Sequence, residues 1–315
     1  MGSREWRMRE KIEMRNEKSA IKKRLHLGLV CLFFFSAVFA FGQAKLGISG
    51  AVEWDKMEIN AKVELDLASA GLKLPNGRTQ GEAIIASEYL RLIRPEILNI
   101  QVDSSSTIAD IVERGELSIF EIESYALEAR TVPPALSPNF DKLLASYTLG
   151  IAGVRSALVR HSRLADIPRT LDPVSTPSYT GIIIIASDSQ PVHGTKNGTA
   201  LLQPCLFPKI WDSDMKLIFE RNMYNQESGP MAHYFPLKGI RAVGPSGLSK
   251  EISAIVGEYP LRIFAKGVFG IKPTDPIIYS DDALLIMSSE ANRNLLREGR
   301  LVIIIDDSML RDEIN

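Results

Sequence analysis

Residues 57–67 alternate between apolar and polar side chains at every position. A repeat of two is typical of a β-strand that buries one face and exposes the other. Upstream, residues 48–54 fit a partner strand, with Asp55 and Lys56 at the turn between them. This part of the chain therefore predicts a β-hairpin.

The next stretch changes to a helical pattern. Thr79 and Glu82 have the spacing of a capping box, in which each side chain satisfies a backbone N–H at the helix start. Thr107 and Ser118 precede two further apolar repeats, and Gly115 lies between them as a stop signal. We expect helices beginning at these three positions, followed after a Pro-Pro pair by a strand that leads into a short helix.

The second half of the chain favours strands. Residues 181–187 contain four consecutive β-branched isoleucines, which predicts a strand covered on both faces. Two apolar segments flank Asp212 and Asp214, predicting a hairpin whose turn acids face water. The segment 260–270 predicts one strand, and residues 300–306 predict the final strand.

Between those two strands, a single helix is expected to follow Ser280 and Asp281. Its buried face would carry four residues at helical spacing, namely Leu284, Met287, Ala291 and Leu295. The predicted fold class is therefore α+β, with an N-terminal hairpin and helices and a β-rich second half ending in a strand–helix–strand unit.

Composition divides the chain into segments. We assign 1–44 to a signal peptide, 45–161 to an N-terminal α+β domain, 162–178 to a linker rich in Pro, Ser and Thr, 179–306 to a C-terminal α+β domain, and 307–315 to a polar tail.

Residues 27–41 are an uncharged apolar run, preceded by the three basic residues at 22–24. Fifteen residues are short for a membrane-spanning helix, which needs about 20, but they fit the apolar region of a secretory signal peptide. Ala44 and Lys45 flank the predicted cleavage point. We expect a periplasmic protein that can also associate with the outer membrane. The alternative is that the apolar segment stays uncleaved and serves as an N-terminal anchor.

Beyond the predicted leader the chain carries 28 Lys and Arg against 34 Asp and Glu, evenly spread. This mild acidity gives no basic patch of the kind that binds nucleic acid. Cys205 is the one cysteine outside the leader, so an intramolecular disulfide is excluded and a buried thiol is expected.

A scan for catalytic motifs yields no assembled set. The chain lacks the H-E-x-x-H, P-loop, G-x-G-x-x-G and G-x-S-x-G patterns that bind zinc, phosphate or dinucleotides or expose a serine nucleophile. We therefore expect no catalytic residue, cofactor or metal. His193, in a polar loop, is the strongest candidate for a small-ligand or catalytic site, and Trp54, Trp211 and Arg297 are candidate interface residues.

Five spaced blocks of the second half resemble the FlgP family of flagellar-assembly and outer-membrane lipoproteins. They are TGIIIIA (180–186), PCLFPKIWDSD (204–214), LRIFAKG (261–267), TDPIIYSDDA (274–283) and LLREGRLVIIID (295–306). The first half resembles uncharacterised exported proteins of spirochaete type. The resemblance implies a structural part of a ring or disk around the flagellar motor, although the chain has no lipobox.

Two hypotheses follow. The first is a non-enzymatic periplasmic structural or assembly protein of the cell envelope. Its expected partners are envelope or flagellar-basal-body proteins, and it can also associate with copies of itself. No nucleic acid or small-molecule substrate is expected. The second is a periplasmic domain that binds or converts a small ligand at a loop site near His193.

Overall fold

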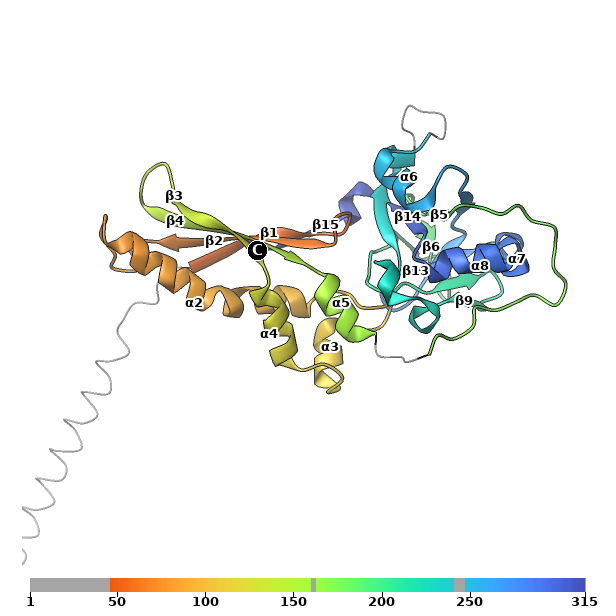
Figure 1. Cartoon of the computed structure of the whole chain (residues 1–315), viewed down its shortest axis with the longest axis horizontal. Helices are drawn as coiled ribbons and strands as arrows, with labels where there is room; N and C mark the ends of the chain where they lie inside the picture. Colours follow the sequence, from red (N-terminus) through yellow and green to blue (C-terminus); the bar gives the residue numbers. More distant parts are fainter. Residues whose placement is uncertain (1–45, 160–162, 241–246, 315) are drawn as a thin grey trace, which may run out of the picture.

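The computed structural model describes residues 46–159, 163–240 and 247–314. The N-terminal half forms an arm of strands and helices that extends from a rounder C-terminal half (Figure 1). The structure is α+β, as predicted. The predicted signal peptide, with its cleavage point between Ala44 and Lys45, lies outside the described residues.

A five-stranded antiparallel sheet forms the arm. Its order is β15-β1-β2-β4-β3, and its strands are β1 (Leu46–Glu53), β2 (Glu58–Asp66), β3 (Arg130–Leu136), β4 (Lys142–Gly150) and β15 (Arg311–Ile314). The predicted hairpin is confirmed as β1 and β2, in which Val52 pairs with Ile59 across the ladder.

Helices cover one face of this sheet. They are α2 (Gly77–Leu98), α3 (Ile108–Glu113), α4 (Ile119–Leu127) and, after β4, α5 (Ala152–Leu158). On β2, Ile59, Ala61, Val63 and Leu65 point into the resulting core and are at most 2% exposed. The alternating pattern of the sequence thus selects which face of the sheet is buried.

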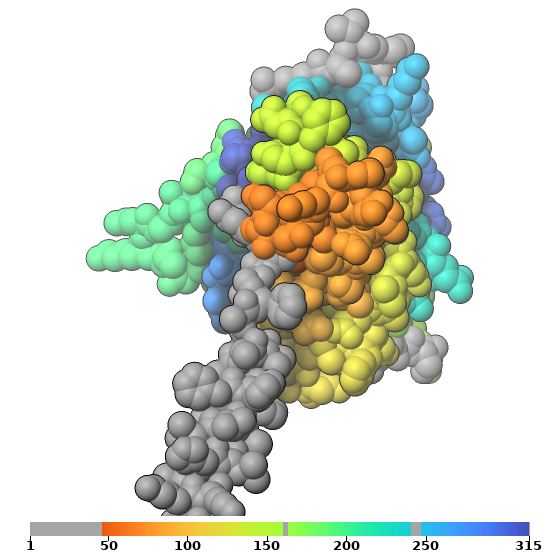
Figure 2. All heavy atoms as spheres, turned by 90° about the vertical axis from the view of Figure 1, so that its left-hand side faces the viewer, coloured from red at the N-terminus to blue at the C-terminus, as the bar shows by residue number. Residues whose placement is uncertain are grey.

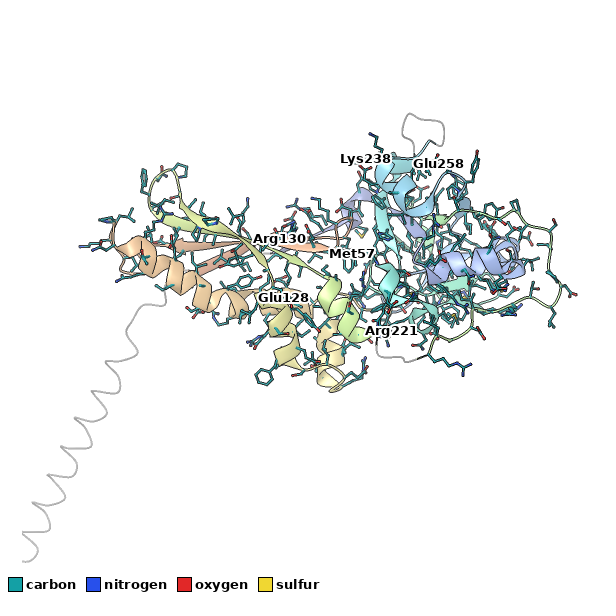
Figure 3. All side chains as sticks on the ribbon, in the orientation of Figure 1. Met57, Glu128, Arg130, Arg221, Lys238 and Glu258 are labelled. Atoms are coloured by element: carbon teal, nitrogen blue, oxygen red, sulfur yellow. The ribbon has the colours of Figure 1, made fainter. Side chains whose placement is uncertain are left out.

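The opposite face of the sheet is open and polar. Lys142 pairs with Glu64 across β4 and β2 at 3.0 Å, and Arg130 of β3 pairs with Glu58 of β2 at 2.6 Å. Figure 3 shows Arg130 beside Glu128, where α4 passes into β3. Such exposed pairs contribute little to stability because solvent screens their charges.

Two of the three predicted helix starts are confirmed. Thr107 and Ser118 cap α3 and α4, each in a capping box with the acidic residue three positions later. The start at Thr79 is wrong, because α2 begins at Gly77. Glu82 instead accepts a hydrogen bond from the Arg78 Nε at 3.0 Å, one helical turn away.

The C-terminal half is built on a four-stranded parallel sheet of order β10-β14-β5-β11. Its strands are β5 (Ile182–Ile185), β10 (His233–Pro236), β11 (Leu261–Phe264) and β14 (Leu301–Ile305). All four residues of β5 are buried, which confirms the prediction of a strand covered on both faces.

Helices and a second sheet complete this half. The helix α6 (Lys250–Val256) covers one face of the parallel sheet. Two more helices are α7 (Ser280–Ser288) and α8 (Glu290–Arg297). The second sheet consists of β8 (Ile210–Asp212), β9 (Leu217–Phe219), β12 (Gly267–Phe269) and β13 (Asp275–Ile278), and β6 (Gln190–Pro191) pairs with β7 (Thr199–Ala200). The short 3-10 helices are Arg221–Met223, Gln226–Ser228, Leu237–Ile240 and Asp307–Met309.

Three details of this half differ from the predictions. The single strand at 260–270 is two strands, β11 and β12, which belong to different sheets. The single helix after residue 280 is two helices, because Ser289 takes an extended backbone and caps α8 through Asn292 N. Asp212, expected to face water, is 2% exposed, whereas Asp214 of the same turn is exposed.

The predicted polar tail, residues 307–315, contains the strand β15, so the tail is not a separate segment. The chain leaves β14, forms one 3-10 turn, and pairs antiparallel with β1, with Glu53 opposite Arg311 and Gly50 opposite Ile314. Three consecutive residues of this strand are charged, so the segment lacks the alternation of apolar and polar side chains from which a strand is predicted. The arm therefore takes its edge strand from the other end of the chain.

Trp54 joins the two halves. Its backbone N–H donates to the Leu310 carbonyl at 3.0 Å, and its indole N–H donates to the Asp312 carboxylate at 2.9 Å. Its ring meets the edge of Tyr234 of β10, with ring centroids 6.1 Å apart. Since Trp54 is only 2% exposed, the prediction of a surface interface residue is wrong: its interface lies inside the chain.

A second contact between the halves runs along the backbone after α2. The amides of Leu206 and Phe207 donate to the carbonyls of Gln101 and Val102 at 3.0 and 2.9 Å. Buried residues of both halves also form one continuous hydrophobic cluster.

A third contact brings α5 against the start of β10. Burial and the nearby guanidinium of Arg155 lower the pKa of His233 to about 4. Arg155 itself is 7% exposed. Both groups are thus desolvated where the halves meet, and the imidazole is neutral in the folded protein at neutral pH.

We expect Trp54→Ala to lower the free energy of unfolding by about 3–5 kcal/mol, the usual cost of removing a buried aromatic side chain. Urea unfolding followed by circular dichroism would measure the change. Ile271→Ala serves as the control because Ile271 is 86% exposed, and it should change the free energy by less than about 0.5 kcal/mol. Equal values for the two variants would contradict the role assigned to Trp54.

His233 should make the fold sensitive to acid. The folded pKa of about 4 lies below the unfolded value of 6.5, so its contribution is complete above pH 6.5 and is lost as the pH falls toward 4. At about 1.4 kcal/mol per pKa unit, that loss is on the order of 3 kcal/mol. Unfolding measured at pH 7 and pH 4.5 should show a smaller drop for His233→Gln than for the wild type; an equal drop would contradict the assignment.

Candidate functional site

The candidate site is an open groove on the arm, between α2, the end of α4, and the strands β3 and β4. Its volume is about 410 Å³, and apolar and aromatic side chains form most of its lining. We call it the tyrosine groove. Figure 2 views the arm end-on, with α2 in orange below the β3–β4 turn in yellow-green.

Tyr89 of α2 and Tyr147 of β4 line this groove as a stacked pair. Their ring centroids are 3.8 Å apart and the rings are within 13° of parallel. Both side chains lie on the covered face of the sheet, and Tyr89 is only 4% exposed. A flat, rigid aromatic surface of this kind buries apolar groups with little loss of side-chain entropy.

The Tyr89 hydroxyl is buried without a hydrogen-bond partner in the structure. Burial raises the pKa of Tyr89 well above its usual range, so the group stays protonated. An unsatisfied buried hydroxyl costs about 1–3 kcal/mol. The hydroxyl therefore lies beneath the floor of the groove, where its cost falls on the stability of the arm.

Exposed apolar residues form the rim of the groove. Leu127, at the end of α4, is 69% exposed, and Val132 of β3 is 62% exposed. Arg78 borders the groove near Glu82: its Nε donates to the Glu82 carboxylate, and its Nη2 donates to the Pro134 carbonyl at 3.1 Å. The rim thus combines apolar contact area with one charge of each sign.

The edge strand beside the groove is interrupted. Between Val132 and Ala135 the ladder with β4 shifts register, and Pro133 and Pro134 occupy the shift. Proline has no N–H to donate, so this edge is poorly suited to pairing with an added strand. The groove is therefore suited to recognising side chains rather than an extra strand.

His193 lies in a different, smaller hollow of about 280 Å³ in the C-terminal half, lined also by Ser213 and Lys266. Its ring meets the edge of Phe269, with centroids 5.8 Å apart, and Trp211 meets the same Phe269 at 5.6 Å. The structure thus brings His193 and Trp211 to one aromatic side chain, a contact that their separation in sequence did not reveal.

Trp211 is held by a buried carboxylate. Its indole N–H lies 3.4 Å from Asp275, which also accepts bonds from the Lys209 amide and the Thr274 hydroxyl, each at 3.1 Å. Burial raises the pKa of Asp275. Since three donors converge on this carboxylate, its evident task is to orient the strand β8 beside β13.

Cys205 and Arg297 have internal partners. Cys205 is 1% exposed, as expected, and burial raises the pKa of its thiol. Tyr234 lies against it, its hydroxyl donating to the Cys205 carbonyl at 2.9 Å and lying 3.1 Å from the Cys205 amide. Arg297 pairs with Asp166 at 3.0 Å and so ties the linker to α8.

A third hollow, of about 380 Å³, lies between the two halves and is lined by polar and charged groups, among them Glu96 and Lys272. Burial raises the pKa of Glu96. In the described parts of the chain, no three His, Cys, Asp or Glu side chains are grouped so as to hold a metal ion. Nor does any described helix combine the length and apolar character that crossing a membrane requires.

Comparison with known families covers most of the chain. Residues 45–156 match the family model described as Treponema pallidum Tp0624, N-terminal domain, and residues 181–307 match the one described as Treponema pallidum Tp0624, second domain. The chain matches none of the curated proteins with which it was compared.

The hydroxyl of Tyr89 gives a sharp prediction. Tyr89→Phe should raise the free energy of unfolding by about 1 kcal/mol, because the variant buries no unsatisfied hydroxyl. The matched control is Tyr234→Phe, which removes a hydroxyl bonded to the Cys205 backbone. That variant should lose about 1–2 kcal/mol. Urea unfolding of both variants would test the pair; a Tyr89→Phe variant less stable than the wild type would contradict the prediction.

Proposed function

We propose that this chain, which carries the N-terminal and second domains of the Treponema pallidum Tp0624 family, is a non-enzymatic structural or assembly protein of the cell envelope. In this proposal the protein acts by binding a partner protein, and its second half serves as the rigid body that carries the binding arm.

The tyrosine groove supports this proposal more than any other feature. It combines the exposed apolar rim of Leu127 and Val132 with the stacked pair of Tyr89 and Tyr147. Aromatic anchors surrounded by apolar contact area are typical of the energetically dominant part of protein–protein interfaces. A partner side chain in the groove would bury the exposed apolar rim.

The cellular location in this proposal rests on the sequence. The apolar run at 27–41 after a basic segment favours export across the inner membrane, with cleavage between Ala44 and Lys45. The blocks that resemble FlgP proteins support a finer proposal, namely association with the flagellar motor. Envelope or basal-body proteins are then the expected partners.

A second candidate function uses the hollow beside His193. Its Lys266 and Ser213 could hold a small anionic or polar ligand, and a histidine on a loop could move a proton. Against it, the His193 ring packs against the aromatic ring of Phe269 and so is placed as a packing side chain. We therefore rank ligand binding at this hollow below protein binding at the arm.

Cross-linking followed by pull-down from fractionated cells would test the proposed function. The tagged wild-type protein should appear in the periplasmic or envelope fraction and capture a large complex. Ala86→Arg places a long side chain in the groove, because Ala86 lies on its lining, and should reduce capture at least tenfold, equivalent to about 1.4 kcal/mol.

The matched control is Ser87→Arg, which adds the same side chain to the next exposed position of α2 and should capture the complex as the wild type does. Free monomer in every fraction, or equal capture by the two variants, would count against the proposal. If His193→Ala abolished the function of the protein in its native cells and Ala86→Arg did not, the second candidate function would replace the first.

A further inference from the structure

The linker between the halves is a fixed loop rather than a free tether. At its start, the Ala165 amide donates to the Asn222 carbonyl at 2.9 Å, and Asp166 pairs with Arg297. At its end, the Val174 amide donates to the Ser288 hydroxyl at 3.0 Å. Residues 168–173 are thus held from both sides, and they project beyond α7 and α8 (Figure 1).

Asn292 strengthens the second attachment. This side chain is fully buried; its oxygen accepts from the Tyr179 amide at 3.2 Å, and its nitrogen donates to the Pro177 carbonyl at 3.1 Å. A buried amide that satisfies both its oxygen and its nitrogen on one loop fixes that loop in place. The projecting residues are therefore presented in a defined conformation, which lowers the entropic cost of binding.

Leu171 lies at the tip of this loop and is 97% exposed, more than any other large apolar residue in the described ranges. Arg169 and Asp172 lie beside it in the sequence. The loop thus presents one apolar side chain between a positive and a negative group. The tyrosine groove presents the matching surface: an apolar hollow bordered by the ion pair of Arg78 and Glu82.

The loop and the groove lie at opposite ends of the molecule, the loop beyond α7 and α8 and the groove on the arm (Figure 1). One copy cannot place its own loop in its own groove. We propose that the tyrosine groove receives residues 168–173 of a second copy of this chain, with Leu171 entering beside Leu127. This inference rests on the proposed function, in which the groove binds a protein.

The geometry of this contact sets the kind of assembly. Because the loop and the groove are different surfaces, the contact is heterologous, and each bound copy still offers a free loop at one end and a free groove at the other. Repetition builds an open chain of copies, or a ring if successive rotations close. A symmetric dimer is not the end product of this contact.

Sedimentation velocity of the purified protein from about 1 µM to about 1 mM, the range in which weak protein contacts form, would test the inference. The wild type should show species larger than a dimer that grow with concentration. Leu171→Ser and Ala86→Arg should each remain monomeric, with an association constant at least tenfold weaker. Ile271→Ser, which alters another highly exposed apolar residue, and Ser87→Arg should associate as the wild type does.

Mixing the two defective variants is the decisive measurement. Leu171→Ser retains an intact groove and Ala86→Arg retains an intact loop, so an equimolar mixture should form a one-to-one dimer and nothing larger. Circular dichroism of each variant establishes that it is folded; Leu127→Ser replaces Ala86→Arg if the latter fails to fold.

Three outcomes would overturn the inference: a wild type that stays monomeric at all concentrations, association that survives in both variants, or a mixture that forms no dimer. A monomeric wild type that still captures an envelope complex in cells would remove only the loop contact and leave the proposed function in place. Loss of capture from cells would instead remove the proposed function.

Discussion

The pairing of β1 with β15 is the contact on which the arrangement of the whole chain depends. It bonds Trp54 of the first half to Leu310, which directly precedes the last strand, and to Asp312 of that strand, and the indole packs against Tyr234 of the parallel sheet. The backbone bonds after α2 and the contact of α5 with β10 also join the halves, but only this pairing supplies the arm with a strand. With its edge strand supplied by the other half, the arm continues the hydrophobic core of the body.

The fixed position of the arm matters because the arm carries the tyrosine groove. The stacked rings of Tyr89 and Tyr147 lie on the covered face of the sheet, whereas the rim residues remain in contact with solvent. The Pro133–Pro134 interruption discourages other strands from joining the same edge. The arm therefore keeps an apolar groove open to solvent while it resists the nonspecific strand pairing to which exposed sheet edges are prone.

Regular patterns in the sequence predicted the elements that depend on local rules. The alternation at 57–67 identified β2 and its buried face, and the capping residues Thr107 and Ser118 located two helix starts. The elements missed were those decided by distant partners. β15 consists mainly of charged residues, and it becomes a strand by pairing with β1 from the other end of the chain. The burial of Asp212 was missed for a local reason: amide N–H groups of its own turn donate to its carboxylate, which the residue type alone does not indicate. The tyrosine groove is lined by residues from four elements, so no local sequence motif could predict it.

The first and last strands of the arm have a consequence for how the protein forms. Trp54 and its carboxylate partner are 258 positions apart in the chain, so the first half cannot acquire its outer strand until the ribosome has delivered nearly all of the described sequence. Contacts between residues so far apart in the sequence slow folding, because the chain loses the entropy of closing a long loop before the contacts stabilise it. Until then β1 presents an unpaired edge that a neighbouring chain can occupy, so the incomplete arm is exposed to strand-to-strand aggregation.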